Sequence, residues 1–206
     1  MRTRVAAAAL SLAMAGCPFH PRAPDPRTDV GDWARTRDTA TRRLELYDGL
    51  VHRATATATH LGPEVRRARA ERLAQWLSWT DEELRRRLAE EATEAGRYEE
   101  FVLVLYTADK DDNDLDSTRS VWRVAVETEG VEVLAGRITG LEDEANLRGL
   151  FPWIGPFDVV YSVRFPRSAE PLEGRPFVLR ISSAIGQIPL DFGKPAKPFV
   201  VPRAGP

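Results

Sequence analysis

Between residues 32 and 100 the apolar positions recur every three or four residues, which is the spacing of one face of an α-helix. The first such series consists of Trp33, Ala40, Leu44, Tyr47, Leu50, Val51 and Ala54. Gly62 and Pro63 then mark the end of one helix and the start of the next, and Thr80 with Glu83 forms a capping box for a third. We therefore expect residues 32–100 to fold as a helical hairpin or a three-helix segment.

After residue 101 apolar positions alternate with polar ones, which is the pattern of half-buried strands. The expected strands cover residues 101–107, 121–128, 131–137, 157–165, 176–183 and 187–192, with one short helix at 141–150. Glu129 and Gly130 are a two-residue hairpin signal between the second and third of these strands. Because helices and strands do not alternate, we expect an antiparallel β-sandwich-like domain over residues 101–206, and an α+β protein as a whole.

The start of the chain has the layout of a secretory leader, with two arginines before an apolar run at residues 5–16. The sequence Leu-Ala-Met-Ala-Gly-Cys that ends at Cys17 resembles the lipobox of bacterial lipoproteins. The resemblance implies that residues 1–16 are a signal peptide and that Cys17 carries the lipid that anchors the mature protein in a membrane. Pro18 stands where an aspartate would retain such a protein at the inner membrane, so we expect the outer membrane.

The composition of residues 17–31 predicts a tether, and the charge balance of the chain excludes nucleic acid as a partner. Residues 17–31 contain four prolines, which favour an extended spacer between the lipid and the folded part. The chain has 29 basic and 31 acidic residues and a formal net charge of −2, which is not the strongly basic balance of a nucleic-acid-binding protein. Its one cysteine is the expected lipidation site, so no disulfide is expected within the chain.

An acidic loop at residues 109–117 is the strongest candidate for a metal site. Oxygen-bearing side chains at alternate positions suit a hard cation such as calcium, and the expected ligands are Asp109, Asp111, Asn113, Asp114 and Asp116. The loop resembles the first half of an EF-hand loop, but Asp114 stands where that family has glycine and Ser120 where it has the bidentate glutamate. An EF-hand is therefore rejected. A simpler calcium-binding loop and a solvated acidic loop that keeps edge strands apart both remain open.

The three histidines do not indicate a catalytic or zinc site. His20 lies in the tether, while His52 and His60 fall in the first expected helix, so the expected β domain contains no histidine. We therefore expect neither a Ser-His-Asp triad nor a Cys-His pair in the part of the chain best suited to form a pocket.

The turn at residues 150–157 carries aromatic side chains among prolines and a glycine. Phe151, Trp153 and Phe157 could stack on a sugar ring or contact an apolar surface of a partner. The alternative is that Phe151 and Trp153 close the open end of the β domain.

These observations predict a lipid-anchored, non-enzymatic protein of the bacterial cell envelope that acts as a binding or scaffolding subunit with a protein partner. The alternative is a calcium-assisted module that binds glycan or peptidoglycan through the acidic loop and the aromatic turn. A hydrolase that works through two carboxyl groups is a third option, and it requires a cleft in which one carboxyl group has a raised pKa.

Overall fold

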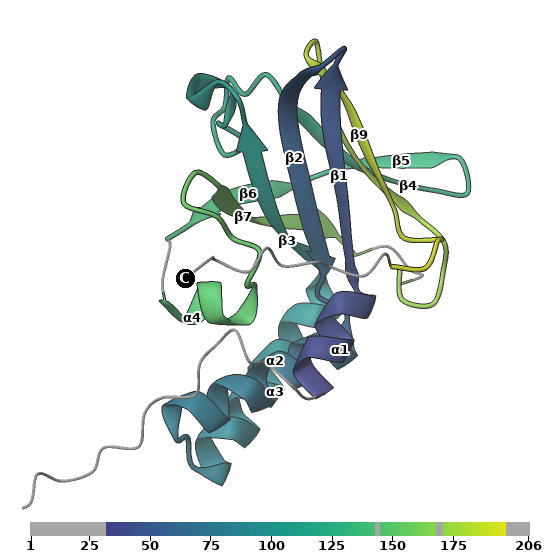
Figure 1. Ribbon diagram of the computed structural model, residues 1–206. Helices are drawn as coiled ribbons and strands as arrows, with labels where there is room; N and C mark the ends of the chain where they lie inside the picture. Colours follow the sequence, from purple (N-terminus) through teal and green to yellow (C-terminus); the bar gives the residue numbers. More distant parts are fainter. Residues whose placement is uncertain (1–31, 143–144, 168–170, 197–206) are drawn as a thin grey trace, which may run out of the picture.

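The computed structural model describes residues 32–142, 145–167 and 171–196. In these residues the chain is an α+β protein, as expected, with helices and two antiparallel sheets (Figure 1). The helices are α1 (Asp32–Thr39), α2 (Pro63–Leu77), α3 (Asp81–Arg97) and α4 (Ala145–Leu150). The strands are β1 (Thr41–Asp48), β2 (Val51–His60), β3 (Tyr98–Thr107), β4 (Arg123–Thr128), β5 (Val131–Leu134), β6 (Arg137–Leu141), β7 (Val159–Pro166), β8 (Val178–Ser183) and β9 (Gly186–Asp191). Sheet A has the order β1-β2-β3-β7-β6, and sheet B has the order β5-β4-β8-β9.

The helical prediction was wrong for residues 41–60, which form the antiparallel β1–β2 hairpin. Residues 54–59 alternate alanine and threonine, and this period of two is that of a strand. The alanines at 54, 56 and 58 belong to the core between the sheets, and the intervening threonines face the other side. Both faces of this part of β2 are buried, so no contrast between buried and exposed positions marks the strand. Leu44, Tyr47 and Leu50, which completed the apparent helical face, are exposed.

Three predictions that rest on neighbouring residues were confirmed: the start of α2, the capping box of α3 and the turn between β4 and β5. Pro63 is the first residue of α2, with Gly62 extended before it. The Thr80 hydroxyl accepts the Glu83 N–H, and the Glu83 carboxylate accepts the Thr80 N–H at 2.7 Å, which completes the capping box of α3. The Glu129–Gly130 turn joins β4 to β5 with both residues at positive φ. The six expected strands all exist, whereas β6 was not predicted.

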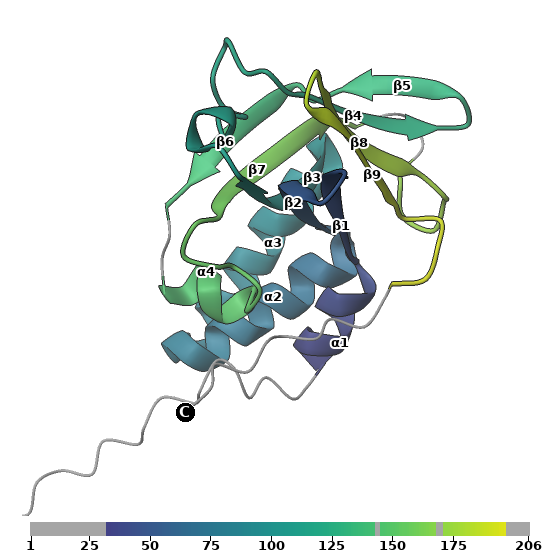
Figure 2. The same ribbon diagram turned by 45° about the horizontal axis from the view of Figure 1, so that its top comes forward.

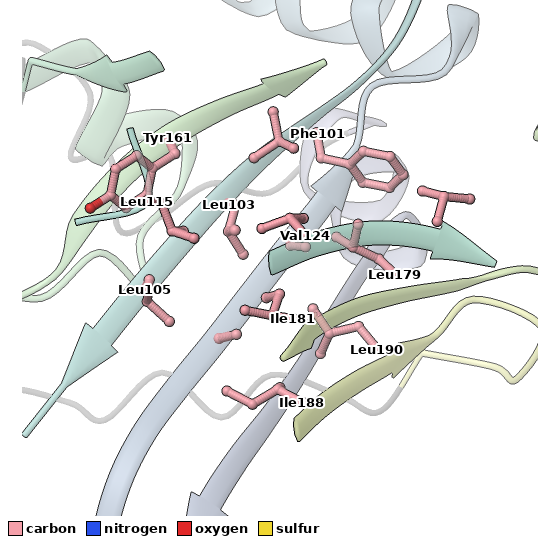
Figure 3. Close-up of a cluster of buried hydrophobic side chains, with 14 of the residues drawn as sticks. Phe101, Leu103, Leu105, Leu115, Val124, Tyr161, Leu179, Ile181, Ile188 and Leu190 are labelled. Atoms are coloured by element: carbon pink, nitrogen blue, oxygen red, sulfur yellow. The ribbon is translucent and has the colours of Figure 1, made fainter. Parts of the chain in front are cut away.

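The centre of sheet A is buried on both faces, as strand β3 shows. Phe101, Leu103 and Leu105 point into a cluster between the two sheets, where Val124 of β4 and Leu179, Ile181, Ile188 and Leu190 of β8 and β9 meet them (Figure 3). Val102 and Val104 of β3 point the other way, into a second cluster with residues of α1, α2 and α4. Figure 2 shows the helices on one side of sheet A and sheet B on the other.

The segments before and after residue 100 share one sheet. β3 begins at Tyr98 and pairs with β2 on one side and with β7 on the other. The hairpin at residues 41–60 is therefore part of the same core as the strands that follow. In the described part of the chain no helix is long and apolar enough to cross a membrane.

Leu103 provides a test of the core between the sheets. Its side chain is fully buried in sheet A, so Leu103→Ala is expected to lower the free energy of unfolding by about 2–5 kcal/mol through lost apolar contact and a residual cavity. The matched control is Leu134→Ala on β5, where the leucine is exposed and the expected change is below about 0.5 kcal/mol. Urea unfolding followed by circular dichroism measures both, and equal losses would contradict the proposed core.

Candidate functional site

Two of the sequence-predicted sites stay predictions. Cys17 and the tether at 17–31 lie outside the described residues. The acidic loop is described, and within the described residues no group of three or more His, Cys, Asp or Glu side chains is arranged to hold a metal ion.

The polar groups of the acidic loop bind one another and the neighbouring strands. Its aspartates accept internal hydrogen bonds: Asp109 from the Asp111 N–H, Asp114 from the Ser120 hydroxyl and Asp116 from the Gly140 N–H. The Asn113 side chain donates to the Leu105 carbonyl at 2.9 Å and accepts from the Tyr161 hydroxyl at 2.9 Å. Burial raises the pKa of Tyr161 to about 12, so this hydroxyl remains a donor at neutral pH. These contacts attach the loop to β3 and β7.

The aromatic turn is divided between core and surface. Phe151 is fully buried, with its ring edge-on to Trp33 of α1 at a centroid distance of 5.9 Å. Trp153 is half-buried beside Phe151, whereas Phe157 is 67% exposed. The three side chains therefore do not form one stacking surface.

His52 and His60 lie on strand β2 of sheet A, which overturns the expectation that they lie on a helix. His60 is buried against Phe101, and its Nε2 lies 3.0 Å from the Glu99 carboxylate. The other Glu99 oxygen accepts the Leu172 N–H at 3.2 Å. Burial by itself raises the pKa of Glu99, but these two hydrogen bonds and the charges of His60 and Arg167 outweigh it and place the pKa below its usual value.

A cavity of about 730 Å³ lies between the helices α2 and α3 and the strands β3, β6 and β7, and its charged lining residues are arginines and glutamates. Arg66 of α2 is almost completely buried there, and its guanidinium donates to the Leu61 carbonyl at 2.8 Å, to Glu91 at 2.7 Å and to Glu100 at 2.6 Å. Arg69 and Arg87 also pair with Glu91, at 2.7 and 2.9 Å.

The surroundings of Glu91 and Glu100 in this cavity favour their ionised form. Burial by itself raises the pKa of Glu100, but the hydrogen bond from Ser162 and the charges of Arg66 and Arg164 outweigh it, so the pKa lies below its usual value. Burial also opposes ionisation of Glu91, and its arginine partners again lower the pKa overall. A general acid needs a proton to donate at neutral pH, so these two groups do not provide the raised pKa that a carboxyl-based hydrolase requires.

A smaller cavity of about 170 Å³ opens on sheet A near the end of the β1–β2 hairpin. We call it the hairpin pocket. It is lined by Arg43 of β1, by His52, Thr55 and Thr57 of β2, by Val104 and Tyr106 of β3, and by Trp153 and Asp158 of the turn that follows α4. Residues of β2 and of the turn after α4, which lie about one hundred residues apart in the sequence, thus line the same pocket.

His52 is held in this pocket by two aromatic rings and a hydroxyl. Its ring stacks on Tyr106 at 5.3 Å and nearly parallel, and Tyr47 lies at 5.1 Å from the same ring. Its Nε2 lies 2.7 Å from the Thr55 hydroxyl. The register of β1 and β2 shifts at Leu46 and Tyr47, so that one extra residue of β2 is accommodated here. Such a bulge changes the side to which a strand residue points.

Sequence reasoning missed the hairpin pocket because it placed His52, Thr55 and Thr57 on a helix. The alternation of alanine and threonine at residues 54–59 was the signal that could have placed them on a strand. No local pattern could have placed Asp158 in the same pocket, because its position depends on the packing of α4.

The ionised glutamates predict an acid-sensitive fold. Glu91, Glu99 and Glu100 each have a pKa below the ordinary 4.5. Their contribution is fully present above the unfolded value and is lost as pH falls through the folded values, so the free energy of unfolding should decline below about pH 5.

Glu100→Gln tests this expectation. It should lower the free energy of unfolding at pH 7 by about 3–5 kcal/mol, because it removes one partner of a buried ion pair. It should also make the acid decline shallower, whereas the exposed Glu71→Gln on α2 should change neither. Urea titrations from pH 3 to pH 7, on the order of half-unit steps, measure both quantities. An unchanged acid slope in Glu100→Gln would contradict the assignment.

No protein-family model matches this chain, and the curated proteins and the solved structures contain no match to it either. What it does must therefore follow from its own residues and contacts.

Proposed function

We propose that this chain is a non-enzymatic binding or scaffolding subunit of the bacterial cell envelope, anchored through a lipid on Cys17, most simply in the outer membrane. Its β-sandwich-like domain presents the β1–β2 hairpin to a protein partner. One observation carries the proposal: the end of this hairpin exposes large apolar side chains together.

Leu50 at the turn is completely exposed, and its neighbours Val51 and Tyr47 are 55% and 53% exposed. Leu44 on β1 is also exposed. The strands pair here, with Asp48 opposite Val51 and Tyr47 opposite His52, so these side chains belong to one short ribbon. Single exposed apolar residues are common on soluble proteins, but several on one protruding element are typical of an interaction surface. Contact with a partner would remove this surface from water.

The hairpin and the entry of the chain lie at opposite ends of the domain. Figure 1 shows α1 with α2 and α3 at one end of sheet A and the β1–β2 turn at the other. The chain reaches the domain at Asp32, the first residue of α1. An extended spacer at 17–31 would therefore attach at the helical end and leave the hairpin free to point away from the lipid.

The absence of catalysis is part of the proposal, and the ionisable groups support it. Glu91 and Glu100 are neutralised by arginines. His52 lies near the Thr55 hydroxyl, but among the described residues no carboxylate bonds its ring to complete a triad. A hydroxyl and an imidazole without an orienting acid lack the third part of that arrangement.

Cys17→Ser tests the anchor. In a bacterial host that matures lipoproteins, the unaltered full chain should fractionate with the membranes and incorporate labelled palmitate. The variant lacks the thiol that accepts the diacylglycerol, so it should incorporate no label and lose its firm membrane association. Equal labelling and equal membrane association of the two proteins would exclude the lipid anchor.

Leu50 tests the hairpin as the contact surface. A photo-crosslinking amino acid at position 50, in the full chain expressed in cells, should give a discrete adduct with one envelope protein. The matched control is position 77 at the end of α2, where the leucine is also exposed but lies with the helices. The partner contact is then confirmed by Leu50→Asp, which should abolish co-purification of the protein identified. Adducts at 77 and none at 50 would refute the hairpin as the docking element.

A further inference from the structure

The hairpin pocket contains polar groups that the fold leaves uncommitted. In the described part of the chain, the hydroxyls of Thr57 and Tyr106 have no hydrogen-bond partner. Asp158 uses one carboxylate oxygen, Oδ2, to accept the Gly155 N–H at 2.6 Å, and its other oxygen has no partner among the described residues. Thr57 is almost completely buried and lines the pocket. Donors and an acceptor from three segments therefore converge on one small space.

The walls of the pocket are aromatic and rigid. Tyr106 stacks on His52 at an interplanar angle of 6°. Trp153 packs against the buried Phe151 at 5.9 Å, and the Arg37 guanidinium lies 4.9 Å from its ring centroid. Rings held by such contacts do not lose side-chain freedom when a ligand stacks on them, which favours binding.

The charges of the pocket exclude a strongly charged ligand. Arg43 and Asp158 have opposite signs, and Arg43 already pairs with Glu45 at 3.1 Å. A phosphate would meet Asp158, and an ammonium group would meet Arg43. The ligand that fits is neutral, has an apolar face for an aromatic ring, and has hydroxyl or amide groups at its edge. The volume of about 170 Å³ is below the roughly 300–1,000 Å³ of pockets that enclose a whole drug-sized ligand, so it accommodates about one ring.

We propose that the hairpin pocket binds one saccharide ring of a glycan. The ring stacks on the aromatic walls, while its hydroxyl or acetamido groups bond to Thr57, Tyr106 and Asp158. This goes beyond the proposed function, because the pocket and the exposed tip of the hairpin are different surfaces at the same end of the domain. It differs from the calcium-assisted module expected from the sequence, because the acidic loop and calcium take no part.

The test uses the full chain, purified in a detergent without a sugar headgroup, and the trimer of N-acetylglucosamine as the probe. Titration with a chelator present is followed by calorimetry and by tryptophan fluorescence. Saturable binding is expected, and both Thr57→Val and Asp158→Asn should weaken it by about tenfold or more, which is about 1.4 kcal/mol. Thr57→Val is nearly isosteric, and asparagine can still accept the Gly155 N–H, so both variants should keep the fold.

Matched control variants test whether a loss of trimer binding is specific to the hairpin pocket. Thr139→Val on β6 and Asp112→Asn in the acidic loop change the same residue types away from the pocket, and both should bind the trimer like the unaltered chain. No binding by the unaltered chain, or equal binding by the pocket variants, would overturn the proposal.

Crosslinking at position 50 tests the protein-docking role and does not depend on the sugar. A partner adduct without sugar binding would therefore refute only the saccharide site, and sugar binding without an adduct would refute only the protein-docking role.

Discussion

The buried guanidinium of Arg66 is the contact on which the arrangement of the layers depends. It joins α2 to the residue after β2 through the Leu61 carbonyl, to α3 through Glu91 and to β3 through Glu100. Removing it would leave two buried carboxylates without their central partner, which costs far more than an exposed ion pair is worth. Apolar packing alone tolerates sliding of a helix over a sheet. Directional hydrogen bonds to three segments specify one position.

The position of α2 and α3 that these bonds specify leaves the hairpin end of sheet A uncovered by helices. The helices lie at the end of the sheet where the chain enters, and the β1–β2 hairpin extends beyond them (Figure 1). The turn after α4 reaches from the helical cluster toward the uncovered part. It is held by Phe151 in that cluster and by the Leu150 carbonyl, which accepts hydrogen bonds from Trp33 and Arg37. Trp153 and Asp158 reach the hairpin pocket because this turn is anchored on its helical side.

The two surfaces that we assign to binding are therefore neighbours. Tyr47 belongs to the exposed hairpin, and its ring lies against His52, which in turn stacks on Tyr106 in the pocket. Two successive ring contacts, one tilted and one stacked, thus connect the apolar tip to the polar pocket. The charged cavity near Arg66 contrasts with both, because its buried carboxylates Glu91 and Glu100 are paired with arginines.

The sequence by itself determined the features that depend on near neighbours in the chain. Thr80 with Glu83 starts α3, Pro63 starts α2, and Glu129 with Gly130 turns the chain between β4 and β5, because each acts through bonds or dihedral angles within about four residues. The strands after residue 101 were predicted because the alternation of apolar and polar positions is also a local pattern. Only the tertiary structure decided that residues 41–60 are strands, that His52 and His60 lie in a sheet, and that Asp158 lines the same pocket as Thr57. Both faces of β2 are buried from residue 54 on, so no contrast between buried and exposed positions marks this strand, and the alanine–threonine alternation at residues 54–59 was its local signal. The placement of Asp158 depends on the position of α4, which leaves no trace in the local sequence.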